Sequence, residues 1–218
     1  MQADLIIYLV IVLVVVLISM TLHEAMHAFT SYWLGDDTAK EHGRLTLNPI
    51  SHIDPFATVL LPIILAAIGA PPFGAAKPVP FNPSRVKYEE FGAALVGIAG
   101  PLTNFVLAFL GFAVATLLGV NINFIFEGGL TDMFFEAFII VNLAFFIFNM
   151  LPLPPLDGSR LLYAFAPNSA RRFMEAMEQY GIIFIFAIIL LFNNQLGMFM
   201  SIAITFFLNL FRGVFGIA

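Results

Sequence analysis

Cysteine is absent from this chain of 218 residues. Disulfide bonds, a thiolate zinc site and a cysteine nucleophile are therefore excluded, so any metal must be held by histidine and carboxylate side chains. Charge is also scarce, because only 11% of the residues are Asp, Glu, Lys or Arg. The nine basic residues are scattered and form no basic stripe, which argues against nucleic-acid binding.

Apolar residues make up 61% of the chain, and the mean hydropathy is +0.97. A soluble domain of this length cannot bury that much apolar surface. The composition therefore predicts an all-α polytopic membrane protein in a lipid bilayer, with a single membrane domain over residues 1–218. The net charge of −5 adds little, because in a membrane the position of charge matters more than its sum.

The first apolar run covers residues 5–22 and follows an N-terminus without basic residues. It is too long for the core of an ordinary signal peptide, so we expect a retained helix over residues 5–34 that ends at Gly35. At a rise of about 1.5 Å per residue, 18 residues cover about 27 Å. His23 would then lie near the far boundary of the bilayer.

Five further apolar stretches follow, at about 56–70, 91–119, 134–151, 180–192 and 196–211. The last two predict C-terminal spans. Residues 168–179, which directly precede them, predict a short amphipathic helix at the membrane interface. The core would cover about residues 5–160, and the C-terminal helices about residues 168–212.

The basic residues predict the topology, because cytoplasmic loops collect Lys and Arg. Eight of the nine lie in the polar segments 35–55, 71–90 and 152–179, whereas segment 120–133 has none. All of them fall inside if 56–70 is re-entrant, which gives five full spans and an external N-terminus. Arg212 would then lie inside as well. The alternative of six ordinary spans leaves three basic residues outside.

Two polar segments carry signals for a small membrane-associated β element. Leu45 and Leu47 alternate with polar residues within 44–48, which is typical of a short strand. Residues 77–83 contain alternating prolines, which force an extended backbone and exclude a central strand. Together they predict an edge-exposed β element at the cytoplasmic membrane face, and two irregular loops are the alternative.

Residues 23–27 read His-Glu-Ala-Met-His at the end of the first apolar run. On a helix, His23 and His27 are one turn apart and face the same way, which suits two nitrogens on one zinc ion. Glu24 lies beside them and is placed to accept a proton from a metal-bound water. Polar residues reaching for the interface are the alternative, but this does not explain the pairing of the histidines.

Zinc in a catalytic site needs a third protein ligand. The best candidate is Asp157, the only acid between Glu136 and Glu175, which follows a proline-broken segment at the end of an apolar span. In the topology above, Asp157 reaches the same cytoplasmic level as the two histidines. A Pro-Leu-Asp-Gly turn that only shapes a loop is the alternative.

Two asparagines are candidates for substrate binding. Asn149 lies eight residues before Asp157, and Asn104 shares a helix face with Gly97 and Gly100. An amide in such a place can hydrogen-bond a substrate carbonyl or a developing oxyanion. Hydrogen bonding between helices is the alternative for both.

Three further polar residues, His42, His52 and Asp54, precede the segment 56–70. For His52 and Asp54 we expect a role in a turn or a gate rather than in binding the metal.

The pairing of His-Glu-x-x-His with Asn-x-x-Pro-x-Pro-x-x-Asp-Gly at 149–158 resembles the site-2 proteases, a family of intramembrane zinc metalloproteases. Gly-x-x-Gly-Pro-x-x-Asn at 97–104 is similar to a motif of the compact bacterial and archaeal members, which lack PDZ and CBS domains. The likeness covers roughly residues 20–160.

The resemblance implies one Zn²⁺ held by His23, His27 and Asp157, with Glu24 as the general base. It also implies that Asn149 helps to bind substrate, and that three spans (5–34, 91–119 and 134–151) form the catalytic core. Family substrates are single-span membrane proteins such as anti-sigma factors, cleaved after a first cut by another protease. The resemblance thus predicts regulated intramembrane proteolysis in the cell membrane, with the active site near the cytoplasmic face.

Two other functions compete with this one. A membrane metal or ion transporter would use the His and Asp residues as a translocation site, but it gives Glu24 no role and predicts internal repeats. An inactive relative would only bind membrane helices, although the base and all three ligands are present.

Overall fold

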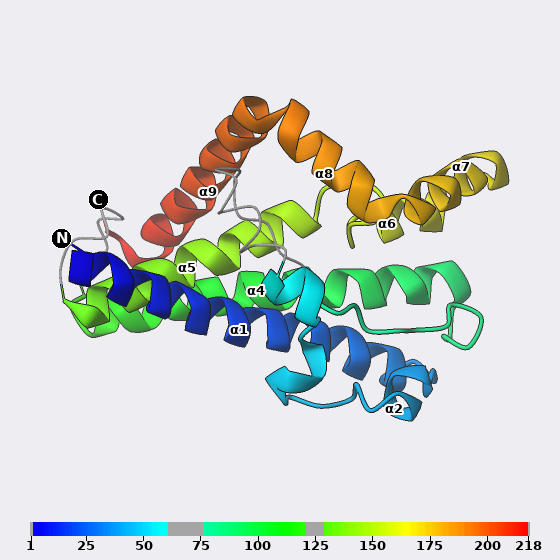
Figure 1. Ribbon diagram of the computed structural model, residues 1–218, viewed down its shortest axis with the longest axis horizontal. Coiled ribbons are helices and arrows are strands. Elements are labelled where there is room, and N and C mark those ends of the chain that lie inside the picture. The colour runs from blue at the N-terminus through cyan, green and yellow to red at the C-terminus, as the bar shows by residue number, and fades with distance from the viewer. Residues whose placement is uncertain (1, 61–75, 121–128, 218) are drawn as a thin grey trace.

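The computed structural model describes residues 2–60, 76–120 and 129–217, and most of them are helical (Figure 1). The elements are α1 (Gln2–Trp33), α2 (Thr38–Glu41), the 3₁₀ turn η1 (Pro49–His52), the π-helical η2 (Pro55–Leu60), α4 (Glu89–Leu117), α5 (Leu130–Asn149), α6 (Ser159–Phe165), α7 (Asn168–Gln179), α8 (Gly181–Leu191) and α9 (Asn193–Phe215). The predicted all-α polytopic class is confirmed.

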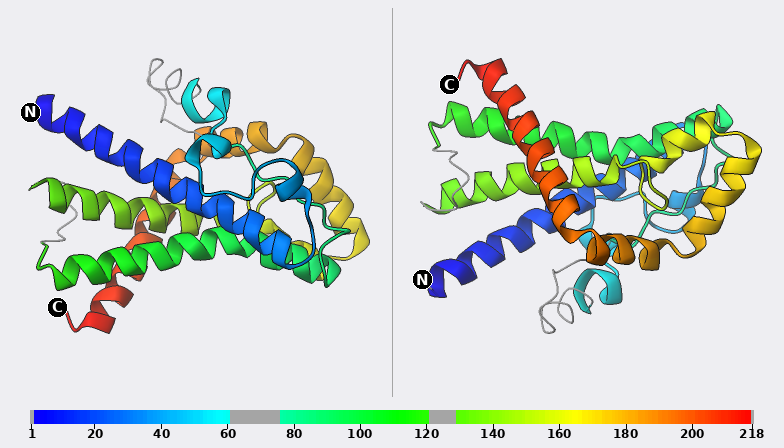
Figure 2. Two further views of the ribbon diagram at one scale, coloured as in Figure 1. Left: turned by 90° about the horizontal axis from the view of Figure 1, so that it is seen from below. Right: turned by 90° about the horizontal axis from the view of Figure 1, so that it is seen from above.

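Helices α1, α4 and α5 form the core of the molecule, lying side by side with α4 in contact with both of the others (Figures 1 and 2). The predicted spans 5–34, 91–119 and 134–151 correspond to these three helices. Helix α9 packs against α5 from the other side. The three-helix core expected from the sequence is therefore present.

Helix α1 ends where the sequence predicts, at Gly35. The φ angle of Gly35 is +102°, in the left-handed region where a residue without Cβ meets no steric penalty. The N–H of Asp36 then donates to the carbonyl of Ser31 at 3.0 Å, which satisfies a carbonyl that the helix end leaves open. The chain reverses direction at this point and continues into the loops that follow α1.

Four helices are long and apolar enough to cross a membrane: Ile6–Trp33, Glu89–Leu117, Leu130–Asn149 and Asn193–Phe215. The protein is thus a multi-pass membrane protein. Helix α7 matches the amphipathic helix predicted over 168–179.

The C-terminal region differs from the prediction. Helix α8 has 11 residues, which cover only about 16 Å, and it follows α7 at a bend of 84°. Helices α8 and α9 then both lead back toward the end of the molecule where the N-terminus lies (Figures 1 and 2). The two full spans predicted at 180–192 and 196–211 are therefore a half-length helix and one span-length helix. Arg212 lies in the last turn of α9, and its side of the membrane stays a prediction.

An aromatic cluster attaches α9 to the core. Phe211 is 1% exposed, and its ring centroid lies 5.2 Å from that of Phe109 and 5.7 Å from those of Phe105 and Phe112 on α4. Rings at these separations gain from edge-to-face and tilted contacts in addition to their burial.

The small β element is not formed, since no strand occurs in residues 2–60, 76–120 and 129–217. The segment 44–48 turns, with the N–H of Thr46 bonded to the carbonyl of Arg44 at 2.9 Å. The segment 77–81 is extended, as its alternating prolines require, but it forms no strand, and Pro78 and Pro80 have no N–H to donate to a β-ladder. Of the predicted segment 56–70, only residues 56–60 are described, within η2, so the re-entrant path lies outside the described residues.

Candidate metal centre

The two histidines of residues 23–27 lie on one face of α1, at the interface with α4 and α5. His23 is 6% exposed and His27 is 8% exposed. Their Nε2 atoms are 3.0 Å apart, and their rings meet edge to face with centroids 4.7 Å apart. The one-turn spacing has thus brought two imidazole nitrogens to one point, as the sequence predicts.

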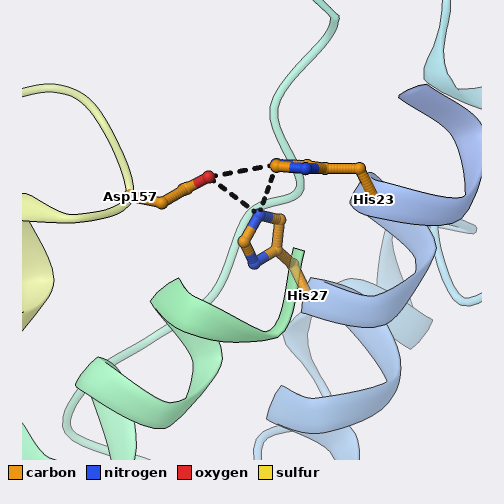
Figure 3. Close-up of side chains that lie close together, drawn as sticks. All are labelled: His23, His27 and Asp157. Atoms are coloured by element: carbon orange, nitrogen blue, oxygen red, sulfur yellow. Dashed lines mark hydrogen bonds and ion pairs between the residues drawn. The ribbon is translucent and has the colours of Figure 1, made fainter. Parts of the chain in front are cut away.

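Asp157 completes a cluster of three ligand atoms, as Figure 3 shows. Its Oδ2 lies 3.0 Å from Nε2 of His23 and 3.4 Å from Nε2 of His27. A tetrahedral zinc ion with ligands at ~2.0–2.1 Å requires ligand atoms about 3.3–3.4 Å apart. The three observed separations are close to this edge length, so the donor set and its geometry fit zinc.

The loop after α5 carries Asp157 back to the histidines. Helix α5 ends at Asn149, and the proline-rich segment that follows cannot continue it. The N–H of Gly158 then donates to the carbonyl of Asn149 at 2.6 Å, so the loop closes on the end of the helix. Asp157 is fixed next to this hydrogen bond, and it comes from an element that is far from α1 in the sequence.

Helix α4 approaches the cluster closely because glycines face it. A Cβ at Gly100 would stand 2.6 Å from Nε2 of His23 and 2.4 Å from Nε2 of His27. A Cβ at Gly97 would stand 3.0 Å from the carbonyl oxygen of Asp157. The backbone of α4 therefore forms one wall of the cluster. A side chain at position 100 would displace the imidazoles, whereas one at position 97 would first meet the side chain of Arg160, at 2.7 Å.

The outer nitrogen of each imidazole has a hydrogen-bond partner on α4. Nδ1 of His27 donates to the carbonyl of Val96 at 2.7 Å. Nδ1 of His23 is 2.6 Å from Oδ1 of Asn104. With the protons on both Nδ1 atoms, both Nε2 lone pairs point at the common centre, which is the arrangement that metal-binding histidines require.

Asn104 is 0% exposed and does not face open space. Besides His23, it contacts Asn142 on α5 and the carbonyl of Ser19 on α1, at 2.9 Å and 3.3 Å from its Nδ2. This geometry does not fit the substrate-binding role predicted for Asn104. It fits the alternative of hydrogen bonds between helices, extended by a bond to a candidate metal ligand.

Glu24 is 9% exposed and lies beneath an extended strap formed by residues 77–82. Its Oε2 accepts the N–H of Val79 at 3.1 Å. The strap is held at one end by the N–H of Lys77, which donates to the carbonyl of His52 at 3.0 Å. At the other end the N–H of Asn82 donates to Oδ2 of buried Asp36 at 2.6 Å.

The hydrogen bonds found for the remaining candidates go to residues other than His23, His27 and Asp157. Nδ2 of Asn149 donates to the carbonyl of Phe145 at 3.0 Å, within α5. His52 is fully buried and its Nε2 lies 2.9 Å from the carbonyl of Thr46. His42 is exposed, and Asp54 accepts the N–H of Phe56 at 2.9 Å in a local turn.

The Asp157 carboxyl is biased toward its ionised form. Burial alone would raise its pKa, but the adjoining His27 and His23 imidazoles outweigh burial and hold the pKa of Asp157 well below its usual value. An ionised carboxylate is the form that binds a cation.

Sequence reasoning missed several residues around the cluster. Asn142 and Ser19 are 0% exposed in the middle of apolar spans, and Asp36 is 0% exposed just after α1. A single amide in an otherwise apolar helix is a signal that would have pointed to Asn142, because an unpaired amide in a bilayer is costly. The carbonyl of Val96 has no such signal, since every residue carries one.

Comparison with known proteins identifies the family. The family model described as Peptidase family M50 matches residues 123–193. A Bacillus subtilis (strain 168) protein named "Putative zinc metalloprotease YwhC" is 45% identical over 182 residues, which cover 82% of this chain and 78% of that protein. No solved structure matches the chain.

Two mycobacterial proteins named "Putative zinc metalloprotease Rip2" are also similar. The one from Mycolicibacterium smegmatis is 28% identical over 82% of this chain, and the one from Mycobacterium tuberculosis H37Rv is 30% identical over 79%. The matched regions span 65% and 63% of those longer proteins.

The chain belongs to the site-2 protease family of membrane zinc metalloproteases, peptidase family M50. It is a multi-pass membrane metalloprotease, and its cofactor is zinc.

Proposed function

We propose that the chain hydrolyses peptide bonds within or near the transmembrane segments of other membrane proteins. In this proposal His23, His27 and Asp157 bind zinc, and Glu24 is the general base. The observation that carries it is the convergence of two Nε2 atoms and one carboxylate oxygen at 3.0–3.4 Å inside a core of membrane-spanning helices. A transporter gives Glu24 no role, and the family assignment favours hydrolysis.

Zinc, when bound, supplies a Lewis acid that polarises the scissile carbonyl and lowers the pKa of water to about 7. Glu24 accepts a proton from the attacking water and transfers it to the leaving amine, so one water is consumed for each peptide bond broken. Val79 holds one carboxylate oxygen of Glu24 through its N–H, which leaves the other oxygen for the water. The carbonyl of Val96 keeps His27 oriented during the reaction.

The strap of residues 77–82 supports a mode of substrate binding. A transmembrane helix hides its peptide bonds in its own hydrogen-bond ladder, so it must unwind before cleavage. The strap is extended and lies against Glu24. Pro78 and Pro80 have no N–H and the N–H of Val79 is bonded to Glu24, so these residues offer only their carbonyls to a neighbouring strand. We propose that an unwound substrate segment adds alongside it and donates its N–H groups to these carbonyls. Segment 44–48, the other predicted candidate, is turned and suits this role less.

We propose single-span membrane proteins as substrates, in regulated intramembrane proteolysis that follows a first cut by another protease. The resemblance to site-2 proteases supports this. The basic residues of the loops around the metal centre support an orientation in which this end of the molecule faces the cytoplasm and the N-terminus lies outside. Asn149, at the end of α5 beside the Asp157 loop, remains our candidate for substrate contact.

A Glu24→Gln variant tests the proposal. The amide keeps the size of the side chain and still accepts the N–H of Val79, but it cannot take a proton from water. We expect cleavage of a membrane substrate in proteoliposomes to fall by at least a thousandfold while zinc content stays at one per chain. Glu41→Gln is the matched control, because Glu41 is exposed and pairs with Arg85 at the surface. Wild-type cleavage by Glu24→Gln would rule out the assigned base.

A further inference from the structure

We propose that Asn142 on α5 is a positioning residue for zinc binding. It fixes the orientation of the Asn104 amide, which in turn sets the proton of His23 on Nδ1 and leaves Nε2 free for the metal. This inference rests on the proposed function, because it takes His23 as a zinc ligand. The hydrogen bonds of Asn142 go to Asn104, Ser19 and Phe138, and none of these is a candidate metal ligand.

The contacts form one continuous chain across three helices. Nδ1 of His23 lies 2.6 Å from Oδ1 of Asn104, and Nδ2 of Asn104 lies 2.9 Å from Oδ1 of Asn142. Nδ2 of Asn142 lies 2.9 Å from Oγ of Ser19 and 2.8 Å from the carbonyl of Phe138. Ser19, Asn104 and Asn142 are each 0% exposed, so the network is closed to bulk solvent.

Two backbone carbonyls fix the direction of every hydrogen bond in this chain, because a carbonyl only accepts. The carbonyl of Phe138 requires the NH₂ group of Asn142, so Oδ1 of Asn142 turns toward Asn104. The carbonyl of Ser19 and Oδ1 of Asn142 then both require the NH₂ group of Asn104. Oδ1 of Asn104 is left to face His23, where it accepts the Nδ1 proton.

A rotated Asn104 amide would exchange the roles of the two His23 ring nitrogens. Its NH₂ group would then face Nδ1, which would become the acceptor, and the imidazole proton would move to Nε2. A protonated Nε2 has no lone pair for zinc. Asn142 opposes this rotation, since its carbonyl oxygen, 2.9 Å away, would meet the carbonyl oxygen of Asn104 in a buried site. The carbonyl of Ser19 opposes it less, because its bond to Asn104 is longer, at 3.3 Å.

His27 is an internal reference for this argument. Its Nδ1 donates directly to the backbone carbonyl of Val96, which cannot rotate. The tautomer of His27 therefore needs no side-chain network, and a change at Asn142 should affect His23 alone.

The test uses the full chain in phospholipid nanodiscs and measures zinc affinity by competition with a chelator. Asn142→Leu keeps a similar volume without a hydrogen-bonding group. We expect it to weaken zinc binding by about 10–100-fold, the range found when an outer partner of a metal ligand is lost. In the metal-free protein, ¹⁵N spectra of labelled histidine should show a second tautomer for His23 and an unchanged tautomer for His27. If Asn142→Leu does not fold, Asn142→Ala takes its place.

Repeating the substitution in an Asn104→Asp variant distinguishes a lost orientation of the Asn104 amide from a general loss of structure. In Asn104→Asp, either carboxylate oxygen accepts the Nδ1 proton, so the His23 tautomer no longer depends on Asn142, and Asn142→Leu also removes the contact between Oδ1 of Asn142 and the second carboxylate oxygen. Asn142→Leu should then weaken zinc binding by less than about threefold in this background, a non-additivity expected only for residues that act through one another. Thr116→Val controls for loss of a buried hydroxyl, because Oγ1 of Thr116 has no hydrogen-bond partner in the described part of the chain.

Two results would overturn the role of Asn142. One is an equal loss of zinc affinity on Asn142→Leu in the wild type and in Asn104→Asp. The other is wild-type zinc affinity and an unchanged His23 tautomer in Asn142→Leu. His23→Ala separates this result from failure of the proposed function. If His23→Ala bound zinc as tightly as the wild type, the proposed zinc site would be wrong and this role of Asn142 with it. Loss of zinc in His23→Ala, together with wild-type behaviour of Asn142→Leu, would overturn only the inference about Asn142.

Discussion

Gly100 on α4 lies directly against His27 on α1, so that a Cβ at position 100 would stand 2.4 Å from Nε2 of the imidazole. Cβ atoms do not approach other heavy atoms this closely in real structures. The glycine is thus required for space rather than for an unusual backbone angle. The backbone of α4 acts as a wall that sets how deep the metal centre lies between the helices.

Gly100→Ala should therefore impair the metal centre. The added methyl group must displace Nε2 of one or both histidines, since the backbone of α4 is held against α1 and α5. We expect zinc affinity to fall at least tenfold, and cleavage to fall with it, because ligands displaced by a few tenths of an ångström no longer converge. Competition with a chelator measures the affinity.

Gly213→Ala on α9 is the control for this substitution. A Cβ there meets nothing within 4 Å, and alanine favours a helix over glycine by about 1 kcal/mol. It should leave zinc affinity unchanged. If Gly100→Ala also bound zinc as the wild type does, the close approach of α4 to the histidines would be incorrect.

Asp36→Ala should separate catalysis from zinc binding. The buried Asp36 carboxylate accepts the N–H groups of Asn82 and Thr38 and the hydroxyl of Thr38, so its loss leaves three donors without this partner and frees one end of the strap. An unsatisfied buried group costs about 1–3 kcal/mol. The strap then holds Glu24 less firmly through Val79, and we expect kcat/KM to fall about tenfold or more. Zinc affinity should not change, because the three ligands have no contact with Asp36.

Asp37→Ala is the matched control, since Asp37 is adjacent and exposed. It should retain wild-type kcat/KM. Parallel losses of zinc affinity and activity in Asp36→Ala would mean that the strap supports the ligands and not the base.

Removal of zinc should destabilise the core. A ligand that binds only the folded state adds about 2.7 kcal/mol of stability when its free concentration is 100 times its Kd. The three ligands come from α1 and from the loop after α5, so zinc links elements that are distant in the sequence. Chelation should therefore lower Tm in the wild type and in Glu24→Gln, but should have no effect in His27→Ala. A Tm of the wild type that is insensitive to chelation would contradict zinc binding at this cluster.

The parts of the fold that the sequence predicts well are those set by local patterns. The long apolar runs predict α1, α4 and α5, and an amphipathic pattern predicts α7 over residues 168–179. The grouping of His23, His27 and Asp157 follows from one-turn spacing for the two histidines and from an isolated acid after a broken helix for Asp157. Each of these signals lies within a few residues of the feature that it predicts.

The parts that escape prediction depend on contacts between distant segments. Nothing local indicates that the amide of Asn104 faces His23 or that Asn142 stands behind it, because both hydrogen bonds join different helices. The strap contact between Val79 and Glu24 joins residues 55 positions apart, and the prolines beside Val79 signalled only an extended backbone. The path of α8 and α9 depends on the bend after α7, which hydropathy alone does not reveal.

The path of α8 and α9 leads to a prediction about topology. If they form one route across the membrane, both chain ends lie on the same side, opposite the loop that follows α1 (Figure 1). Since the chain has no cysteine, single cysteines placed at Gln2, Ile217 and Asp37 give unambiguous labels. With the orientation that the basic residues support, a membrane-impermeant maleimide should modify positions 2 and 217 in intact spheroplasts, and position 37 only after lysis. Labelling of positions 217 and 37 from one side would mean instead that α8 and α9 each cross the membrane.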